Sequence, residues 1–178
     1  MKLLFVLHFL MLGGNEMKRG TIQVYYGLGS GKTNAAIGQC IKEAGKGAQV
    51  IVIQFLKGKD IEEYKIMERL EPEIKLFRFE KEQGYYKELT ENQKKDEKAN
   101  ILNGFNFAKK VLETRGCDLL ILDEILGLWD LNIITTEELI GLIQLKADEC
   151  DLILTGRTFP EELEQYVDSI SEIRYIKG

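Results

Sequence analysis

A glycine-rich turn between an expected strand and an expected helix constrains this chain more than any other feature. Residues 21–26 alternate in polarity and are rich in β-branched and aromatic types, which predicts a strand. The sequence GLGSGKT follows at residues 27–33, and residues 32–44 carry apolar side chains at helical spacing without a proline. Such a turn gathers backbone N–H groups and a helix N-terminus around one point, which favours binding of an anion such as phosphate.

The lysine and threonine at the end of this turn indicate a nucleotide. The Lys32 ammonium can reach a terminal phosphate, and the Thr33 hydroxyl can ligate Mg²⁺. A strict loop of the form G-x-x-x-x-G-K-[ST] needs glycine at the position of Tyr26, whereas here the first glycine is Gly27. A tight turn without a ligand is the alternative, and it leaves Lys-Thr at the first helical turn unexplained.

Expected strands and helices alternate along the rest of the chain. Residues 49–55, 117–122 and 151–154 are nearly continuous apolar runs, typical of strands that are covered on both faces. Alternation implies a mostly parallel sheet with right-handed crossovers and helices on both faces. We therefore expect an α/β fold with a single P-loop (RecA-like) domain. The remaining expected elements are helices at residues 60–70, from within 80–98 to 112, from 136 to about 148 and at 159–166, and strands at 74–79 and 171–176.

Two acids end one of the buried strands. The sequence LLILDE places Asp123 and Glu124 at the carboxyl end of a strand near the phosphate loop, where magnesium needs carboxylate partners. We expect Thr33, Asp123 and Glu124 to hold Mg²⁺, with a helix cap as the alternative for one acid. Arg157 ends another strand at the same edge, in the sequence LTGR; a phosphate contact, a bond that fixes the loop and an ordinary surface position are all open for it.

Composition excludes several classes of function. The formal net charge is −5, with acids and bases mixed along the chain, which argues against nucleic acid as a partner. The three cysteines form no C-x-x-C pair, so neither a disulfide framework nor a zinc knuckle is expected, and buried thiols in a reducing cytoplasm fit this usage.

The N-terminal segment differs from the rest of the chain. Its apolar run is shorter than the ~20 residues of a membrane span, so we expect no membrane partner. We expect residues 1–16 to be a translated leader or a non-native extension before Met17, with a helix that packs on the domain as the alternative. Residues 17–178 then form the nucleotide-binding domain. The one histidine, His8, lies in the segment and receives no chemical role.

The motifs together resemble the cobalamin (corrinoid) adenosyltransferases of the CobA/BtuR/CobO type. That family has the loop T-G-x-G-x-G-K-T-T, in which glycine occupies the position of Gly27. It also has the motifs V-x-x-x-Q-F-x-K-G, L-D-E and T-G-R, and a similar final strand. The resemblance extends from Arg19 to Lys177. The matching residues outside the loop are Val50, Gln54, Phe55, Lys57, Gly58, Leu122, Asp123, Glu124, Thr155, Gly156 and Arg157.

The resemblance implies an ATP:corrinoid adenosyltransferase. A reduced corrinoid attacks the ribose C5′ of MgATP through Co(I), and triphosphate leaves as a unit. Because the corrin is the nucleophile, no protein base is required. Catalytic roles are implied for Lys32, Thr33 and Glu124, together with a homodimer, a cytoplasmic location and a flavoprotein-type reductase. The implied ATP-binding residues are Gly27, Leu28, Gly29, Ser30, Gly31, Lys32, Thr33, Asn34, Lys42 and Arg157.

A tyrosine pair marks the expected corrinoid contact. The family's aromatic G-F-x-W run corresponds to Tyr85, Tyr86 and Lys87 here, so Tyr85 and Tyr86 are the candidates for the lower corrin face. An ordinary lid or partner surface is the alternative for the pair. Two alternatives to the whole assignment are open as well: an ATP- or corrinoid-binding paralogue that is not catalytic, and a generic P-loop ATPase.

Overall fold

The computed structural model describes residues 19–177, apart from residues 30, 57–66 and 82–85. The expected leader or extension at residues 1–16 therefore lies outside the described residues, as do Ser30, Tyr85 and most of the helix expected at 60–70. The end of that expected helix is described, and it is a short 3₁₀ turn, η2 (Met67–Leu70).

Six strands form one sheet in the order β3-β2-β4-β5-β1-β6, and every neighbouring pair is parallel. This confirms the α/β fold with a parallel sheet. The carboxyl ends of all six strands lie at one edge, and β5 separates β1 from β4. The strands are β1 (Ile22–Tyr26), β2 (Val50–Gln54), β3 (Ile74–Arg78), β4 (Leu119–Asp123), β5 (Asp151–Gly156) and β6 (Ser169–Glu172).

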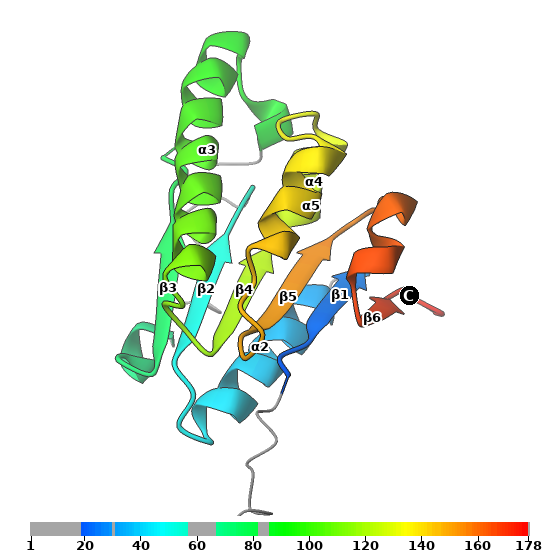
Figure 1. Cartoon of the computed structure of the whole chain (residues 1–178). Helices are drawn as coiled ribbons and strands as arrows, with labels where there is room; N and C mark the ends of the chain where they lie inside the picture. Colours follow the sequence, from blue (N-terminus) through cyan, green and yellow to red (C-terminus); the bar gives the residue numbers. More distant parts are fainter. Residues whose placement is uncertain (1–18, 30, 57–66, 82–85, 178) are drawn as a thin grey trace, which may run out of the picture.

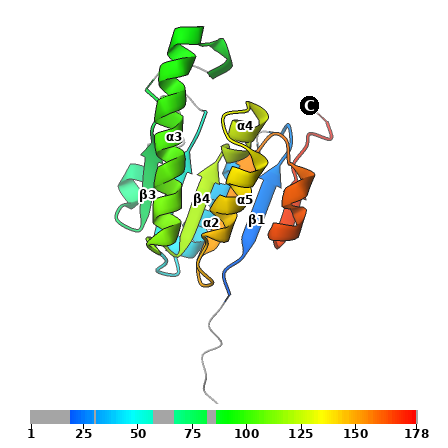
Figure 2. The same ribbon diagram turned by 45° about the horizontal axis from the view of Figure 1, so that its top comes forward.

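Helices cover both faces of the sheet (Figures 1 and 2). One face packs against α2 (Gly31–Ala44), and the other packs against α3 (Glu91–Glu113), α4 (Ile125–Asp130) and α5 (Thr136–Gln144). The sheet thus has a hydrophobic core on each face. Alternate residues of β4 belong to different cores: Ile121 packs with α2, whereas Leu120 and Leu122 pack with the other helices. Burial on both faces explains the continuous apolar runs of the central strands.

Several elements differ from their expected bounds. The helix expected from 136 to about 148 ends at Gln144, and the one expected at 159–166 is a 3₁₀ helix, η4 (Glu161–Tyr166). The final strand begins and ends earlier than the expected 171–176. All four of its residues are exposed, so no apolar pattern marks it; backbone pairing with β1 determines its position instead. The short helix α4 was not expected from the sequence.

Among the helices of the described residues, none combines the length and the apolar character that a membrane span needs.

Candidate nucleotide-binding site

The phosphate loop leaves β1 at Gly27, whose backbone adopts a φ of 122°. This conformation is accessible almost only to glycine. A Cβ atom at Gly27 would also collide with the carbonyl group of Ile173. The Gly27 N–H donates to the carbonyl oxygen of Gly156 at 3.2 Å. The displaced first glycine therefore has a local cause, because it is position 27, and not position 26, that turns the chain out of the strand.

The residue that follows β6 closes one side of the loop. The Gly29 N–H donates to the Ile173 carbonyl at 3.2 Å, and the Ile173 N–H donates to the Tyr26 carbonyl at 2.7 Å. The Ile173 side chain lies against Gly31 as well. Sequence reasoning assigned no role to Ile173, and no signal could have revealed one, since these hydrogen bonds use backbone atoms alone.

Lys32 and Thr33 stand in the first turn of α2, and both are buried. The Lys32 ammonium donates to the carbonyl oxygens of Gly27 and Gly29 at 2.7 and 2.9 Å, so the loop wraps around this charge. The Thr33 hydroxyl donates to Asp123 Oδ1 at 3.0 Å. The structure thus brings the start of α2 to the end of β4, although β5 lies between β4 and β1 in the sheet.

Asp123 is the centre of a buried polar cluster at the carboxyl edge of the sheet. Its side chain accepts hydrogen bonds from the Thr33 hydroxyl, the Thr155 hydroxyl at 2.7 Å and the Gln54 amide at 3.3 Å. These donors come from α2, β5 and β2, so four elements converge on one carboxylate. Sequence reasoning assigned no role to Gln54 or Thr155, although both are polar residues at the ends of apolar strands.

Glu124 follows Asp123 in a left-handed backbone conformation, with a φ of 61°. Its N–H donates to the Thr155 hydroxyl at 2.8 Å, so Thr155 joins the two acids by accepting from one and donating to the other. Glu124 is the N-cap residue of α4, but its side chain makes no capping hydrogen bond to that helix. The position is that of a helix cap, as the alternative supposed, whereas the carboxylate does not act as one.

The oxygen atoms of Thr33, Asp123 and Glu124 are of the kind that Mg²⁺ prefers. The described residues contain no group of three His, Cys, Asp or Glu side chains that would make an all-protein metal cage. Magnesium in nucleotide sites takes one or two protein ligands and completes its shell with phosphate and water, so this donor set suits it. A buried acceptor next to Asp123, Gln54 Oε1, has no hydrogen-bond partner among the described residues, which fits a site that a ligand completes.

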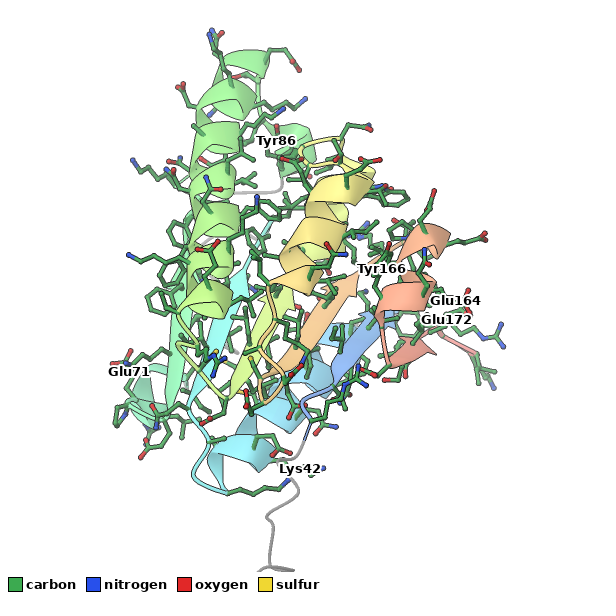
Figure 3. All side chains as sticks on the ribbon, viewed as in Figure 1. Lys42, Glu71, Tyr86, Glu164, Tyr166 and Glu172 are labelled. Atoms are coloured by element: carbon green, nitrogen blue, oxygen red, sulfur yellow. The ribbon has the colours of Figure 1, made fainter. Side chains whose placement is uncertain are left out.

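Three other predicted ATP-binding residues lie at the surface. Leu28 and Asn34 are exposed at the loop and in the first turn of α2, and Arg157 is exposed directly after β5. Lys42 stands in the last turn of α2, ten residues after Lys32 and thus about 15 Å further along the helix axis. Figure 3 shows it at the end of the molecule opposite the carboxyl edge. The structure does not bring Lys42 together with the loop.

Tyr86, the described member of the tyrosine pair, begins a 3₁₀ turn, η3 (Tyr86–Glu88), beside the start of α3 (Figure 3). Its hydroxyl donates to the Lys94 carbonyl at 3.4 Å, and burial raises its pKa above the ordinary value. The ring is partly buried and packs against the core that lies between the sheet and helices α3, α4 and α5. Its contact with a corrinoid stays a prediction.

Two acidic residues anchor the chain near this aromatic segment. Glu80 Oε1 accepts from the Leu56 N–H at 2.8 Å, just beyond the end of β2. Glu97, buried in α3, accepts from the Lys81 N–H at 2.7 Å. Burial raises the pKa of Glu80; the hydrogen bond from Leu56 opposes this shift, and the nearby charge of Glu97 adds to it. Sequence reasoning missed both, because acids within a highly charged stretch are normally solvated.

The parallel sheet with helices on both faces defines an α/β protein, and the glycine loop between β1 and α2 and the Thr33–Asp123 contact are consistent with a P-loop-like domain. Within that class the family can be specified. A family model described as ATP:corrinoid adenosyltransferase BtuR/CobO/CobP matches residues 18–178, and the chain belongs to this family.

Individual relatives carry the same description. The corrinoid adenosyltransferase of Escherichia coli K12 is 29% identical over 160 residues, which cover 90% of this chain and 79% of the relative. Corrinoid adenosyltransferase CobA of Salmonella typhimurium LT2 is 29% identical over 163 residues, covering 91% and 80%. The corrinoid adenosyltransferase of Pseudomonas aeruginosa PAO1 is 25% identical over 160 residues, covering 90% and 77%. These names describe transferases.

Proposed function

We propose that this protein transfers the 5′-deoxyadenosyl group of MgATP to the Co(I) centre of a corrinoid and releases triphosphate. The C5′–O5′ bond of ATP breaks and a Co–C5′ bond forms; the electron pair comes from Co(I), which becomes Co(III), and the triphosphate oxygen leaves with the pair of the broken bond. Family membership and the names of the relatives support the reaction. The observation that carries the nucleotide site is the Thr33–Asp123 hydrogen bond beneath the loop.

The residues around the loop would act by position and charge. Lys32 would hold the negative charge that gathers on the leaving triphosphate, together with the loop N–H groups other than those of Gly27 and Gly29, which donate to Gly156 and Ile173. Thr33, Asp123 and Glu124 would hold Mg²⁺, which when bound neutralises phosphate charge. The loop needs only to grip the leaving group while C5′ faces outward to the corrinoid. The corrinoid supplies the nucleophile, so the proposal requires no general base from the protein.

The finer assignments extend the same proposal. We infer that Tyr85 and Tyr86 contact the corrinoid and that Arg157 and the loop contact ATP. We infer as well that the protein is a homodimer in the cytoplasm and that a flavoprotein-type reductase supplies the electrons that reduce the cobalt of the corrinoid to Co(I). Support for these statements comes from the family resemblance. Lys42 has the weakest support as an ATP contact, because it lies at the far end of α2.

One assay separates this function from its alternatives. The protein is mixed with MgATP and a chemically reduced corrinoid, and both the cobalt absorption spectrum and free triphosphate are followed. We expect adenosylcorrinoid and triphosphate in equal amounts. Release of ADP or orthophosphate would indicate an ATPase, and binding without adenosylcorrinoid above background would indicate a paralogue that is not catalytic; either result would overturn the proposal.

The substitution Lys32→Ala tests the loop directly. We expect ATP affinity to fall at least tenfold, because loss of a buried charge partner costs about 2 kcal/mol or more, while the far-UV circular dichroism stays unchanged. Isothermal titration calorimetry measures the affinity. The control is Lys46→Ala, which removes an exposed lysine that pairs with Glu43 on the surface. An unchanged affinity in Lys32→Ala would show that the loop does not hold the triphosphate.

A further inference from the structure

Gln54 places an amide at the end of a strand whose other four residues are all apolar. It is the last residue of β2, after four apolar residues, and the residue is 1% exposed. In the β2–β4 ladder its Cα partner is Asp123. The amide nitrogen donates to Asp123 Oδ2 at 3.3 Å, whereas the amide oxygen has no hydrogen-bond partner among the described residues.

The chemistry of Asp123 determines which way this amide faces. A carboxylate accepts hydrogen bonds, and the hydroxyls of Thr33 and Thr155 already donate to it. The reversed amide would set an oxygen against a carboxylate oxygen, which is repulsive. The NH₂ group therefore faces Asp123, and the oxygen is left as a buried acceptor beside the same carboxylate because both atoms belong to one planar group.

A purely structural role does not explain such a residue. Buried polar groups almost always find partners, and an unmet buried acceptor destabilises the protein that contains it. An apolar side chain of similar volume would continue the pattern of Val50–Ile53 without that loss. No described residue donates to this acceptor, which lies at the edge where Thr33 and Asp123 meet, so a donor brought by the ligand is the economical explanation.

We propose that Gln54 is a positioning residue of the magnesium–nucleotide site, with its NH₂ group orienting Asp123 and its oxygen accepting a hydrogen bond from a water bound to the metal. The inference rests on the proposed nucleotide site and adds a residue to it. Magnesium dehydrates reluctantly and keeps several waters in protein sites, so a water donor is expected there. Partners in the outer shell of metal sites typically contribute about 10–100-fold to metal affinity.

The experiment measures metal–nucleotide affinity and ligand-free stability in parallel. Mn²⁺ replaces Mg²⁺ so that binding of Mn²⁺–ATP to the full chain can be followed by electron paramagnetic resonance. The variant is Gln54→Met, which keeps the length of the side chain and removes both polar groups. The matched control is Gln23→Met in β1, where the glutamine amide donates to the Thr21 hydroxyl and accepts from the Tyr25 hydroxyl.

We expect Gln54→Met to bind Mn²⁺–ATP about tenfold or more weakly, with a ligand-free urea midpoint at or above that of the wild type. Gln23→Met should bind like the wild type. Equal affinity in Gln54→Met and wild type would overturn the inference, and so would a lowered ligand-free midpoint, which would indicate a structural role. Failure of the wild type itself to bind Mn²⁺–ATP would overturn the proposed nucleotide site.

A second variant covers the case in which Gln54→Met does not fold. Gln54→Asn keeps the amide group, with its NH₂ and its oxygen, on a side chain that is shorter by one methylene group. We expect the same loss of Mn²⁺–ATP affinity with Gln54→Asn, because neither Asp123 nor the metal-bound water would be reached. Wild-type affinity in this variant would overturn the inference.

Discussion

At the scale of single residues, backbone geometry decides the shape of the phosphate loop. Gly27 takes a conformation that other residues avoid, and it lies directly against the backbone of Ile173. Gly38, by contrast, lies within α2, and a Cβ atom added there would meet no heavy atom within 4 Å outside its own helix backbone. We therefore expect replacement by alanine to change the free energy of unfolding in opposite directions at Gly27 and Gly38.

We expect Gly27→Ala to lower the free energy of unfolding by about 1–3 kcal/mol, since alanine at positive φ is strained. Gly38→Ala should raise it by about 0.5–1 kcal/mol, because alanine is the better helix former. Urea denaturation measures both. A Gly27→Ala variant as stable as the wild type would contradict this loop geometry.

The sequence predicts part of this site and misses the rest for a physical reason. Thr33 and Asp123 could be paired in advance, because a loop after one parallel strand and an acid after another share an edge of the sheet. Gln54 and Thr155 received no role because their importance depends on strand order, which places β2 and β5 on either side of β4. Ser30 and Tyr85 stay predictions.

At the scale of elements, α3 begins at a defined hydrogen-bonded cap. The Thr90 hydroxyl accepts from the Gln93 N–H, and the Gln93 side chain accepts from the Thr90 N–H at 3.0 Å. Further along, Gly104 allows the helix to approach the rings of Phe55 and Phe79. The cap thus determines where the helix begins, and the glycine determines how closely it packs on the sheet.

The substitution Thr90→Ala removes the hydroxyl half of this cap. We expect the free energy of unfolding to fall by about 1 kcal/mol and amide hydrogen exchange to accelerate in the first turn of α3. Thr90→Ser keeps a hydroxyl and serves as the control. If Thr90→Ala and Thr90→Ser proved equally stable, the capping box would contribute nothing measurable.

Elements that contribute to both cores could be predicted within one or two residues, as β2 and β4 illustrate. The failures have different causes. In α4, four consecutive residues from Ile125 to Leu128 are buried, so the run carries no helical periodicity. In β6 every residue is exposed, so nothing in its side chains marks the strand.

At the scale of the whole molecule, Glu80, two residues after the end of β3, makes the free energy of unfolding depend on pH. Burial raises the pKa of Glu80 above its ordinary value of 4.5. Folded protein therefore binds this proton more tightly than unfolded protein does. The resulting stabilisation is fully present below about pH 4.5 and is lost as the pH rises through the raised pKa.

We expect Glu80→Gln to remove this dependence while its side-chain oxygen still accepts from the Leu56 N–H. The variant should match the wild type near pH 4.5 and exceed it increasingly at higher pH in urea denaturation. Glu137→Gln should respond in the opposite sense, because hydrogen bonds from its own N–H and from Thr135 hold the pKa of Glu137 below the ordinary value. A constant difference between Glu80→Gln and wild type across this range would contradict the raised pKa.

The contact between Ile173 and the loop also joins the two ends of the described chain, since β1 and the residue after β6 meet there. The Gly29–Ile173 and Ile173–Tyr26 hydrogen bonds use main-chain atoms, so they do not depend on the chemical type of the side chain, although proline would remove the N–H that donates to Tyr26. Any replacement that keeps the N–H and still fits against Gly31 would leave the contact intact. A comparison of sequences could therefore overlook a residue whose place in the chain matters more than its chemical identity.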